Sequence, residues 1–193
     1  MMAKRQPVKD ISWYDFGVDM FVTHDLDPVY SALAMTTMPD DTLKRWLLAY
    51  WCYYSAGVAS KVAEAGSDKF YDLMWQGSGL DGAEKWPRGM ERRYFYGDSA
   101  ANLLNGLEEY GSPEKIADVM TCHTDFLDIF NNVKSFTGFG PWMGWKIADM
   151  AERVLCYNVD FSDSELGIYK DPVQGAAFIV YGDKHHDMPL DEL

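Results

Sequence analysis

The feature that most constrains this 193-residue chain is a glycine turn, F-T-G-F-G-P-W, which separates two helical patterns. Before the turn, residues 124–134 carry apolar side chains at helical spacing. Gly138 and Gly140 then interrupt the pattern with residues that tolerate positive φ angles. Pro141 suits the first turn of a second helix, which the apolar pattern extends to about Leu155. The segment therefore predicts two helices joined by a tight hairpin.

An aspartate follows this helical pair at once, in the tripeptide V-D-F, so that Asp160 lies just beyond the second helix. A glycine hairpin facing a helix N-terminus presents backbone N–H groups, which bind phosphate without reading a nucleotide sequence. Taken alone, the turn is better explained as an ordinary connection between helices. Its pairing with Asp160, at a fixed distance after Trp142, favours a phosphate site.

The hairpin and the following aspartate together resemble the helix-hairpin-helix signature of the DNA glycosylase superfamily. The resemblance implies that Asp160 faces an extruded nucleotide. It also implies that the hairpin contacts the DNA backbone, through Lys134, Gly138, Phe139 and Gly140. Bifunctional members carry a lysine where Trp142 stands here, so Schiff-base lyase chemistry is not expected.

The rest of the chain reads as helical, since no pattern of alternating residues runs longer than four. Apolar residues cover almost the whole surface of the longest predicted helix, 41–65, as in a central buried helix. Shorter helices are expected at 27–37, 67–76, 100–110 and from 113 onward, with one further helix within 1–26. Residues 178–181 fit a short strand or part of a helix. We expect an all-α, glycosylase-like helical bundle that forms one domain over 1–193.

A glycine-rich loop, 77–97, is the second informative segment, because loops of that length inside a compact domain are usually functional. It contains Arg88, Arg92 and Arg93, interleaved with aromatic residues. Arginine forks bind phosphate bidentately, and aromatic faces stack on bases. The alternative is a solvated loop whose arginines pair with its own acids, Glu84 and Glu91.

The phrase W-P-R-x-x-E-R-R in this loop, upstream of G-F-G-P-W and V-D-F, narrows the resemblance. Over about 43–163 the chain resembles the glycosylase-related phage amino acid:DNA transferases, also called α-glutamyl/putrescinyl thymine pyrophosphorylases. The substrate implied is phage DNA whose 5-hydroxymethyluracil has been pyrophosphorylated by a DNA kinase, a possible partner. An amino acid or polyamine displaces the pyrophosphate and leaves a hypermodified thymine. The implied location is the cytoplasm of an infected bacterial host.

The resemblance also implies roles for individual residues. Arg88, Arg92 and Arg93 would neutralise the departing pyrophosphate. Asp160 would deprotonate the incoming ammonium group, or stabilise a cationic intermediate. The stacking candidates for an extruded base are Trp142 and Trp86. Two alternatives remain open: a monofunctional N-glycosylase in which Asp160 acts with water, and a DNA-binding module without chemistry.

The charge of the chain argues against a general affinity for nucleic acid, since its net charge is −13. DNA binding must therefore come from a local patch and from backbone amides, with a strong salt dependence. Neither a membrane span nor a signal peptide is expected.

No metal or cofactor is predicted. The three cysteines form no C-x-x-C pair and read as reduced, mostly buried thiols without zinc. Metal ligation by His24 is disfavoured. His123 is expected to be a helix cap or a surface residue rather than a catalytic one.

Overall fold

The computed structural model describes residues 28–34, 36–164 and 170–187. Within these ranges the regular elements are helices, accompanied by two isolated β-bridges, which confirms the all-α class. No helix in these ranges is long and apolar enough to cross a membrane. The helix expected within 1–26 and His24 lie outside the described residues.

The chain divides into two units, of which the larger is Ala32–Asp163. Helix α10, Lys170–Tyr181, belongs to the other unit and resolves the open choice at 178–181 in favour of a helix. Helix α2 spans Pro28–Ala34, which is shorter than predicted. The prediction of a single domain stays a prediction. Every predicted site residue lies in the larger unit.

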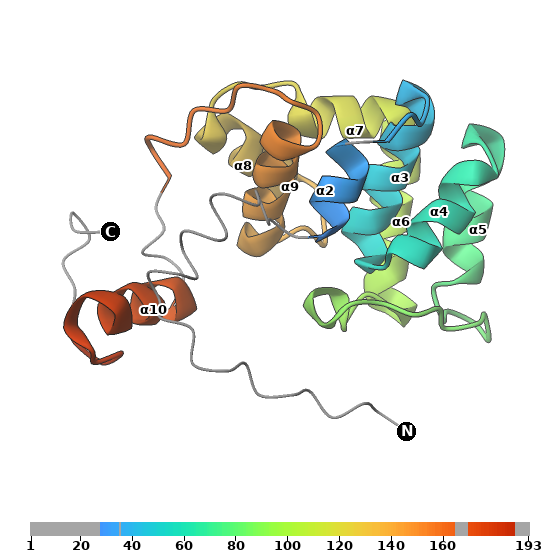
Figure 1. The fold of residues 1–193 in the computed structure, drawn as a ribbon. Coiled ribbons are helices and arrows are strands. Elements are labelled where there is room, and N and C mark those ends of the chain that lie inside the picture. The colour runs from blue at the N-terminus through green and yellow to red at the C-terminus, as the bar shows by residue number, and fades with distance from the viewer. Residues whose placement is uncertain (1–27, 35, 165–169, 188–193) are drawn as a thin grey trace. The chain divides into compact units, whose positions relative to one another are not determined.

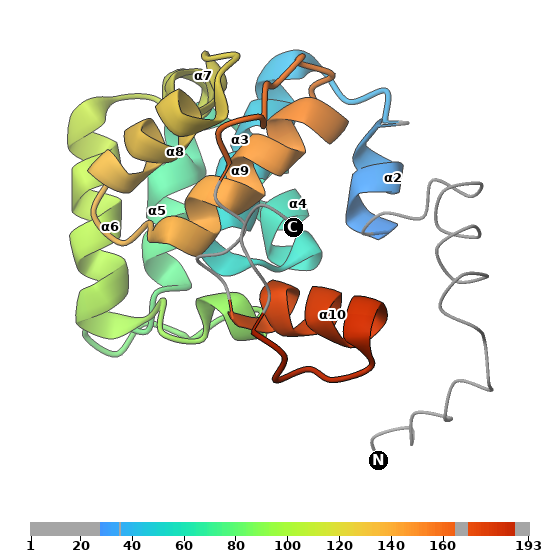
Figure 2. The ribbon, with the colours of Figure 1, turned by 90° about the vertical axis from the view of Figure 1, so that its left-hand side faces the viewer.

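The larger unit is a helical bundle in which α3 packs on α4 and α7, and α8 packs on α9. Figures 1 and 2 show α8 and α9 side by side. Trp51 of α3 lies in the core and donates its indole N–H to the sulfur of Met150 in α9, over 3.3 Å. The helices are α3 Asp40–Tyr53, α4 Ala56–Glu64, α5 Phe70–Gln76, α6 Gly97–Tyr110, α7 Pro113–Thr121, α8 Phe126–Ser135 and α9 Pro141–Arg153, with 3₁₀ turns at Ser67–Lys69 (η1) and Met90–Arg92 (η2).

The single long helix predicted over 41–65 is wrong, because the chain breaks between α3 and α4. Tyr54 ends α3 in the left-handed region, with φ of 51° and ψ of 43°. Ser55 then takes an extended conformation before α4. The break leaves the last carbonyl groups of α3 without partners inside the helix, so that other segments bind them.

Two helices of the larger unit begin at a residue whose side chain caps them. Ser112 caps α7, and its hydroxyl accepts a hydrogen bond from the Lys115 N–H at 3.3 Å. Asp125 caps α8 in the same way through the Asp128 N–H. Asp98 and Ser99 lie inside α6, which begins at Gly97 rather than at the predicted residue 100, and they do not cap the helix.

The predicted hairpin between α8 and α9 is confirmed. Gly138 has a φ of +88°, a value that L side chains rarely adopt. Gly144 in α9 faces Phe130 of α8 so closely that a Cβ there would lie 2.7 Å from the phenyl ring. The two helices can therefore approach each other at this point because α9 carries a glycine.

Candidate active site

The arginine loop, 77–97, is anchored on the broken end of α3. The Gly89 N–H donates to the Tyr53 carbonyl at 2.9 Å, and the Nε of Arg92 donates to the Cys52 carbonyl at 3.0 Å. These carbonyls belong to the C-terminal end of a helix, where partial negative charge favours a cation. The break in α3 thus fixes the position of the loop.

Gly89→Ala is expected to destabilise this anchor. A Cβ at Gly89 would lie 2.7 Å from the backbone oxygen of Tyr54, which cannot rotate away as a side chain can. We expect the free energy of unfolding to fall by about 1–3 kcal/mol. Gly106→Ala, within α6 and facing open space, should raise it by roughly 0.5–1 kcal/mol. Chemical denaturation measures the free energy of unfolding of both variants. Equal values for Gly89→Ala and the wild-type protein would contradict the role of Gly89 in the anchor.

Arg92 joins the loop to the hairpin as well as to α3. Its Nη1 donates to the Gly138 carbonyl at 2.9 Å, and its guanidinium lies 5.3 Å and 5.2 Å from the ring centroids of Phe95 and Phe139. Burial lowers the pKa of Arg92, but an arginine stays protonated in proteins. Arg92 is therefore a structural cation that also borders the site.

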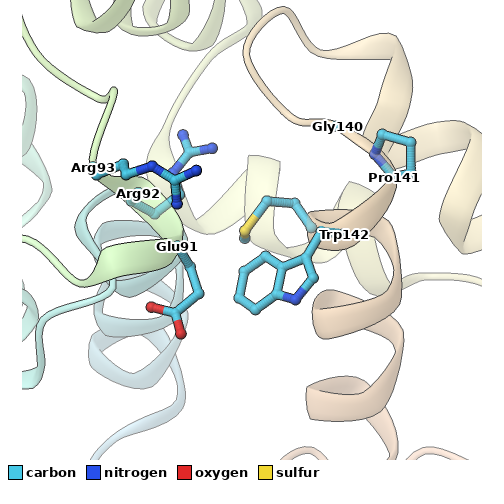
Figure 3. A pocket seen from close by; sticks show the side chains of 7 residues that line it. Glu91, Arg92, Arg93, Gly140, Pro141 and Trp142 are labelled. Carbon is cyan, nitrogen blue, oxygen red and sulfur yellow. The ribbon is translucent and has the colours of Figure 1, made fainter. Parts of the chain in front are cut away.

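The loop and the hairpin together enclose a cavity of about 410 Å³ (Figure 3). Its wall combines two arginines, one acid and the N-terminus of α9, and is formed by Glu91, Arg92, Arg93, Gly140, Pro141, Trp142 and Met143. The two segments singled out by the sequence thus meet at one cavity. We call it the arginine cavity.

Arg93 is the more accessible of its two arginines. Its side chain is exposed, lies 4.8 Å from the Tyr94 ring centroid, and donates one hydrogen bond to the Met90 carbonyl at 3.2 Å. Arg93 also shares a side-chain hydrogen bond with Tyr94, and the residue remains exposed at the edge of the cavity. Arg93 is thus the group best placed to bind an anion in this cavity.

Arg88 does not line the cavity. Its guanidinium donates to the carbonyl oxygens of Gly77, Trp86 and Phe95 and so holds the loop together. The alternative in which the loop arginines pair with its own acids is wrong for the described structure, where these arginines bind carbonyls instead. The Glu84 carboxylate accepts from the Trp86 indole at 3.2 Å.

The two tryptophans predicted to stack on a base differ in exposure. Trp86 is only 6% exposed, lies 6.3 Å from the Tyr53 ring and has the Lys61 ammonium 3.8 Å from its own ring centroid. Trp86 is therefore a core residue here and offers no face to DNA. Trp142 is 37% exposed and contacts Tyr54 edge-on at 5.3 Å. A stacking role for Trp142 stays a prediction.

The hairpin offers one backbone donor to the arginine cavity. Gly140 precedes α9 with φ of −94° and ψ of −176°, and its N–H has no acceptor in the part of the chain that the structure describes. The Phe139 N–H is already bound to the Phe136 carbonyl at 3.1 Å, and its side chain is buried. Lys134 is exposed, with its ammonium 4.9 Å from the Phe130 ring. Gly140 is therefore the hairpin residue best suited to meet a phosphate.

Gly140→Val tests whether the hairpin binds the DNA backbone. Valine fits the extended backbone of Gly140, and a Cβ there meets no atom within 4 Å, so the fold should be retained. The isopropyl group would block a phosphate from the N–H. We expect about tenfold weaker binding to unrelated duplexes alike, measured by fluorescence anisotropy. Unchanged affinity would mean that the hairpin only connects α8 and α9 and does not bind the DNA backbone.

Asp160 lies in a short extended segment beside the start of α8. Its N–H donates to the Thr124 carbonyl at 2.7 Å, and its carbonyl accepts from the Phe126 N–H at 3.0 Å, which forms a parallel bridge. The Asp160 side chain is exposed and accepts from the Ser162 N–H at 2.9 Å. Hydrogen bonds from the backbone N–H and the side chain of Ser162 hold the pKa of Asp160 below its usual range. Asp160 is thus charged at neutral pH and a weaker base than an ordinary aspartate.

A second cavity, of about 330 Å³, lies along α9 and shares one lining residue with the arginine cavity. It is lined by Trp142, which borders both cavities, and by Trp145, Lys146 and Asp149 of the same helix. The Trp145 ring stacks on Phe161 at 5.8 Å. Asp160 lines neither cavity, but its neighbour Phe161 forms part of this aromatic cluster.

The cysteines differ from the prediction in exposure. Cys52 is buried, whereas Cys122 and Cys156 are exposed, and all three are free thiols. His123 does not cap α8, because Asp125 holds that position. Over the described ranges no group of three potential metal ligands occurs.

The sequence reasoning missed Tyr54, whose left-handed backbone ends α3 and whose ring contacts Trp142. Non-glycine residues in this conformation are uncommon and tend to occur at functional sites. The sequence feature that could have indicated the end of α3 is Ser55, because serine is preferred before a helix and here interrupts an otherwise unbroken apolar pattern.

Comparison with known proteins identifies the family of the chain. Residues 22–192 match the amino acid:DNA transferase family. The glycinyltransferase of Pseudomonas phage PaMx11 is 36% identical over 175 residues, which cover 86% of this chain and 59% of the relative. The putrescinyltransferase of Delftia phage PhiW-14 is 27% identical over 172 residues, which cover 86% and 53%. The chain thus spans little more than half the length of these relatives. It belongs to the amino acid:DNA transferase family.

Proposed function

We propose that this chain transfers an amino acid or amine to DNA by displacing pyrophosphate from 5-pyrophosphoryloxymethyl-uracil, which leaves a hypermodified thymine. One observation carries the proposal. Two arginines of the loop and the free N–H of the hairpin border a single cavity, next to an exposed tryptophan. A pyrophosphate-leaving reaction needs such a concentration of donors, whereas base hydrolysis does not.

The fold that supports this reaction is of the helix-hairpin-helix glycosylase kind. Three local features support this part of the proposal: the antiparallel pair α8 and α9, the positive φ of Gly138, and the extended segment at Asp160. In such a fold the hairpin binds the DNA backbone and the target base leaves the helical stack. Extrusion costs a few kcal/mol, which contacts to the extruded base must offset.

Pyrophosphate binding falls mainly to Arg93, with Arg92 behind it. Both cations border the arginine cavity, and Arg93 is the exposed one of the two. Bidentate, charge-assisted hydrogen bonds strengthen as the leaving oxygen gains negative charge. Arg88 contributes indirectly, because it maintains the shape of the loop that carries Arg93.

The thymine ring lies along Trp142 and the second cavity, toward the segment that carries Asp160. Departure of pyrophosphate leaves positive charge on the ring and its methylene group. The ionised Asp160 carboxylate stabilises that charge rather than acting as the principal base, since its lowered pKa makes it a poor proton acceptor. The acidic surface of the protein weakens DNA binding little when the phosphate groups of the substrate are bound at one local site.

The co-substrate class follows from the relatives, whose names specify glycinyl and putrescinyl transfer. We therefore assign an amino acid or polyamine as the amine donor. The DNA substrate requires an earlier kinase reaction that pyrophosphorylates 5-hydroxymethyluracil. The setting we infer is the phage-infected bacterial cell.

Alkali treatment of the reacted DNA separates this function from base excision. The protein is incubated with pyrophosphorylated DNA, with and without amine, and the strands are then heated in alkali. A transferase leaves the strands intact and releases pyrophosphate only when amine is present. Alkali-labile sites in the DNA would support a monofunctional glycosylase that uses Asp160.

A further inference from the structure

Glu91 is an acidic side chain in a cavity whose other charged groups suit an anion. The residue is exposed and lies in η2 (Met90–Arg92), directly before the two arginines of the site. No ion pair in the described part of the chain uses its carboxylate. A negative charge beside a pyrophosphate site weakens the binding of that anion. The position of Glu91 therefore requires another explanation.

The charges in this cavity are separated in space. Figure 3 shows the Glu91 carboxylate directed away from the guanidinium groups, toward the side where the indole of Trp142 lies. The cavity thus has a cationic end for an anion, and an anionic end bordered by an aromatic ring. A carboxylate attracts an ammonium ion by its charge, and an indole face attracts it by the cation–π interaction.

We propose that Glu91 and the indole of Trp142 bind the ammonium group of the incoming primary amine beside the pyrophosphate. The proposal rests on the proposed transferase function and adds the second substrate to the same cavity. An ammonium group is common to amino acids and polyamines, so this contact serves either class. Discrimination between the two classes must come from other residues.

The bond changes in this step balance without an oxidant or reductant. One proton passes from the ammonium to the Glu91 carboxylate, and from there to water. The freed nitrogen lone pair forms a bond to the 5-methylene carbon. The bond between that carbon and the pyrophosphate oxygen breaks, and its electron pair leaves with the pyrophosphate bound at Arg93. The product is a secondary ammonium on the modified thymine.

Asp160 does not fit the amine-binding role as well as Glu91 does. It lines neither cavity, and its carboxylate is already bound to the Ser162 N–H. That hydrogen bond stabilises the charged form and weakens the group as a base. The two carboxylates therefore have different roles. Asp160 stabilises positive charge on the thymine, and Glu91 binds the amine.

Steady-state kinetics with the full chain test this assignment, with glycine or putrescine varied at saturating pyrophosphorylated DNA. Glu91→Gln should raise the KM for the amine by about 10- to 100-fold, because a charge-assisted contact is lost. The affinity for DNA should stay equal or increase. Glu91→Asp should restore part of the loss. The KM of Glu91→Gln should also fall as pH rises, since unprotonated amine needs no proton acceptor.

Asp81→Asn is the matched control, because Asp81 is an exposed acid of the same loop outside the cavity. It removes the same charge and should leave the KM for the amine unchanged. A Glu91→Gln protein with wild-type KM and turnover would overturn the inference while modified nucleoside still forms. Failure of the wild-type protein to form that nucleoside would instead overturn the transferase function and, with it, this inference.

Discussion

Asp160→Asn is expected to reduce turnover by roughly 10²–10⁴ while the protein stays folded and binds DNA. The amide keeps the shape of the side chain and its contact with the Ser162 N–H, but it removes the negative charge. The backbone bonds that place Asp160 beside α8 do not depend on the side chain. Single-turnover kinetics on pyrophosphorylated DNA measure the loss, and thermal unfolding checks the fold.

The pH dependence of the wild-type protein provides a second test of Asp160. Because its pKa lies below the usual range, the carboxylate is charged at neutral pH and in mild acid. Activity that depends on this charge is lost only as pH falls through that lowered pKa. Asp163→Asn, an exposed acid of the same segment, should turn over like wild type. Near wild-type turnover in Asp160→Asn would remove Asp160 from the mechanism.

Arg93→Ala should abolish the preference for pyrophosphorylated DNA over DNA that carries only hydroxymethyl groups. A hydrogen bond to a charged group contributes about 1.5–3 kcal/mol, so affinity for the pyrophosphorylated DNA should fall by roughly 10- to 100-fold. Affinity for the hydroxymethyl DNA should change little. Arg93→Lys should restore the preference only in part, because lysine lacks the two-pronged geometry. Competitive binding with the two DNAs measures both effects.

Arg93 is a better test than Arg92, whose loss would also remove hydrogen bonds to the Cys52 and Gly138 carbonyls and disturb the fold. Arg153→Ala is the matched control for charge. Arg153 is the last residue of α9, about 20 Å along the helix from the arginine cavity, and it pairs with Asp149. An equal loss of affinity in both variants would indicate general electrostatics rather than a pyrophosphate site.

The parts of the fold that short stretches of sequence determine were predictable. The hairpin follows from Gly138 and Pro141, whose backbone preferences act locally. The cap at Ser112 is equally local. The convergence of the loop and the hairpin was predictable only through the family resemblance, because nothing in their spacing specifies a shared cavity.

The features that depend on tertiary contacts were not predictable. The apolar pattern runs on through Tyr54, but the helix ends there, and Gly89 and Arg92 bind the carbonyls that the break exposes. The loop residues likewise have roles that composition does not distinguish. Arg88 binds carbonyls and Trp86 is buried, whereas Arg93 is exposed.

Isotope-labelled amine gives the most direct test of the central claim, that an amine displaces pyrophosphate at the arginine cavity. Pyrophosphorylated DNA is incubated with the protein and ¹⁵N-labelled glycine or putrescine, and the nucleosides are then analysed by mass spectrometry alongside released pyrophosphate. We predict a ¹⁵N-labelled thymidine derivative in equal amount to the pyrophosphate, with no free base. Pyrophosphate release without label in the DNA, or free base with abasic sites, would contradict the account.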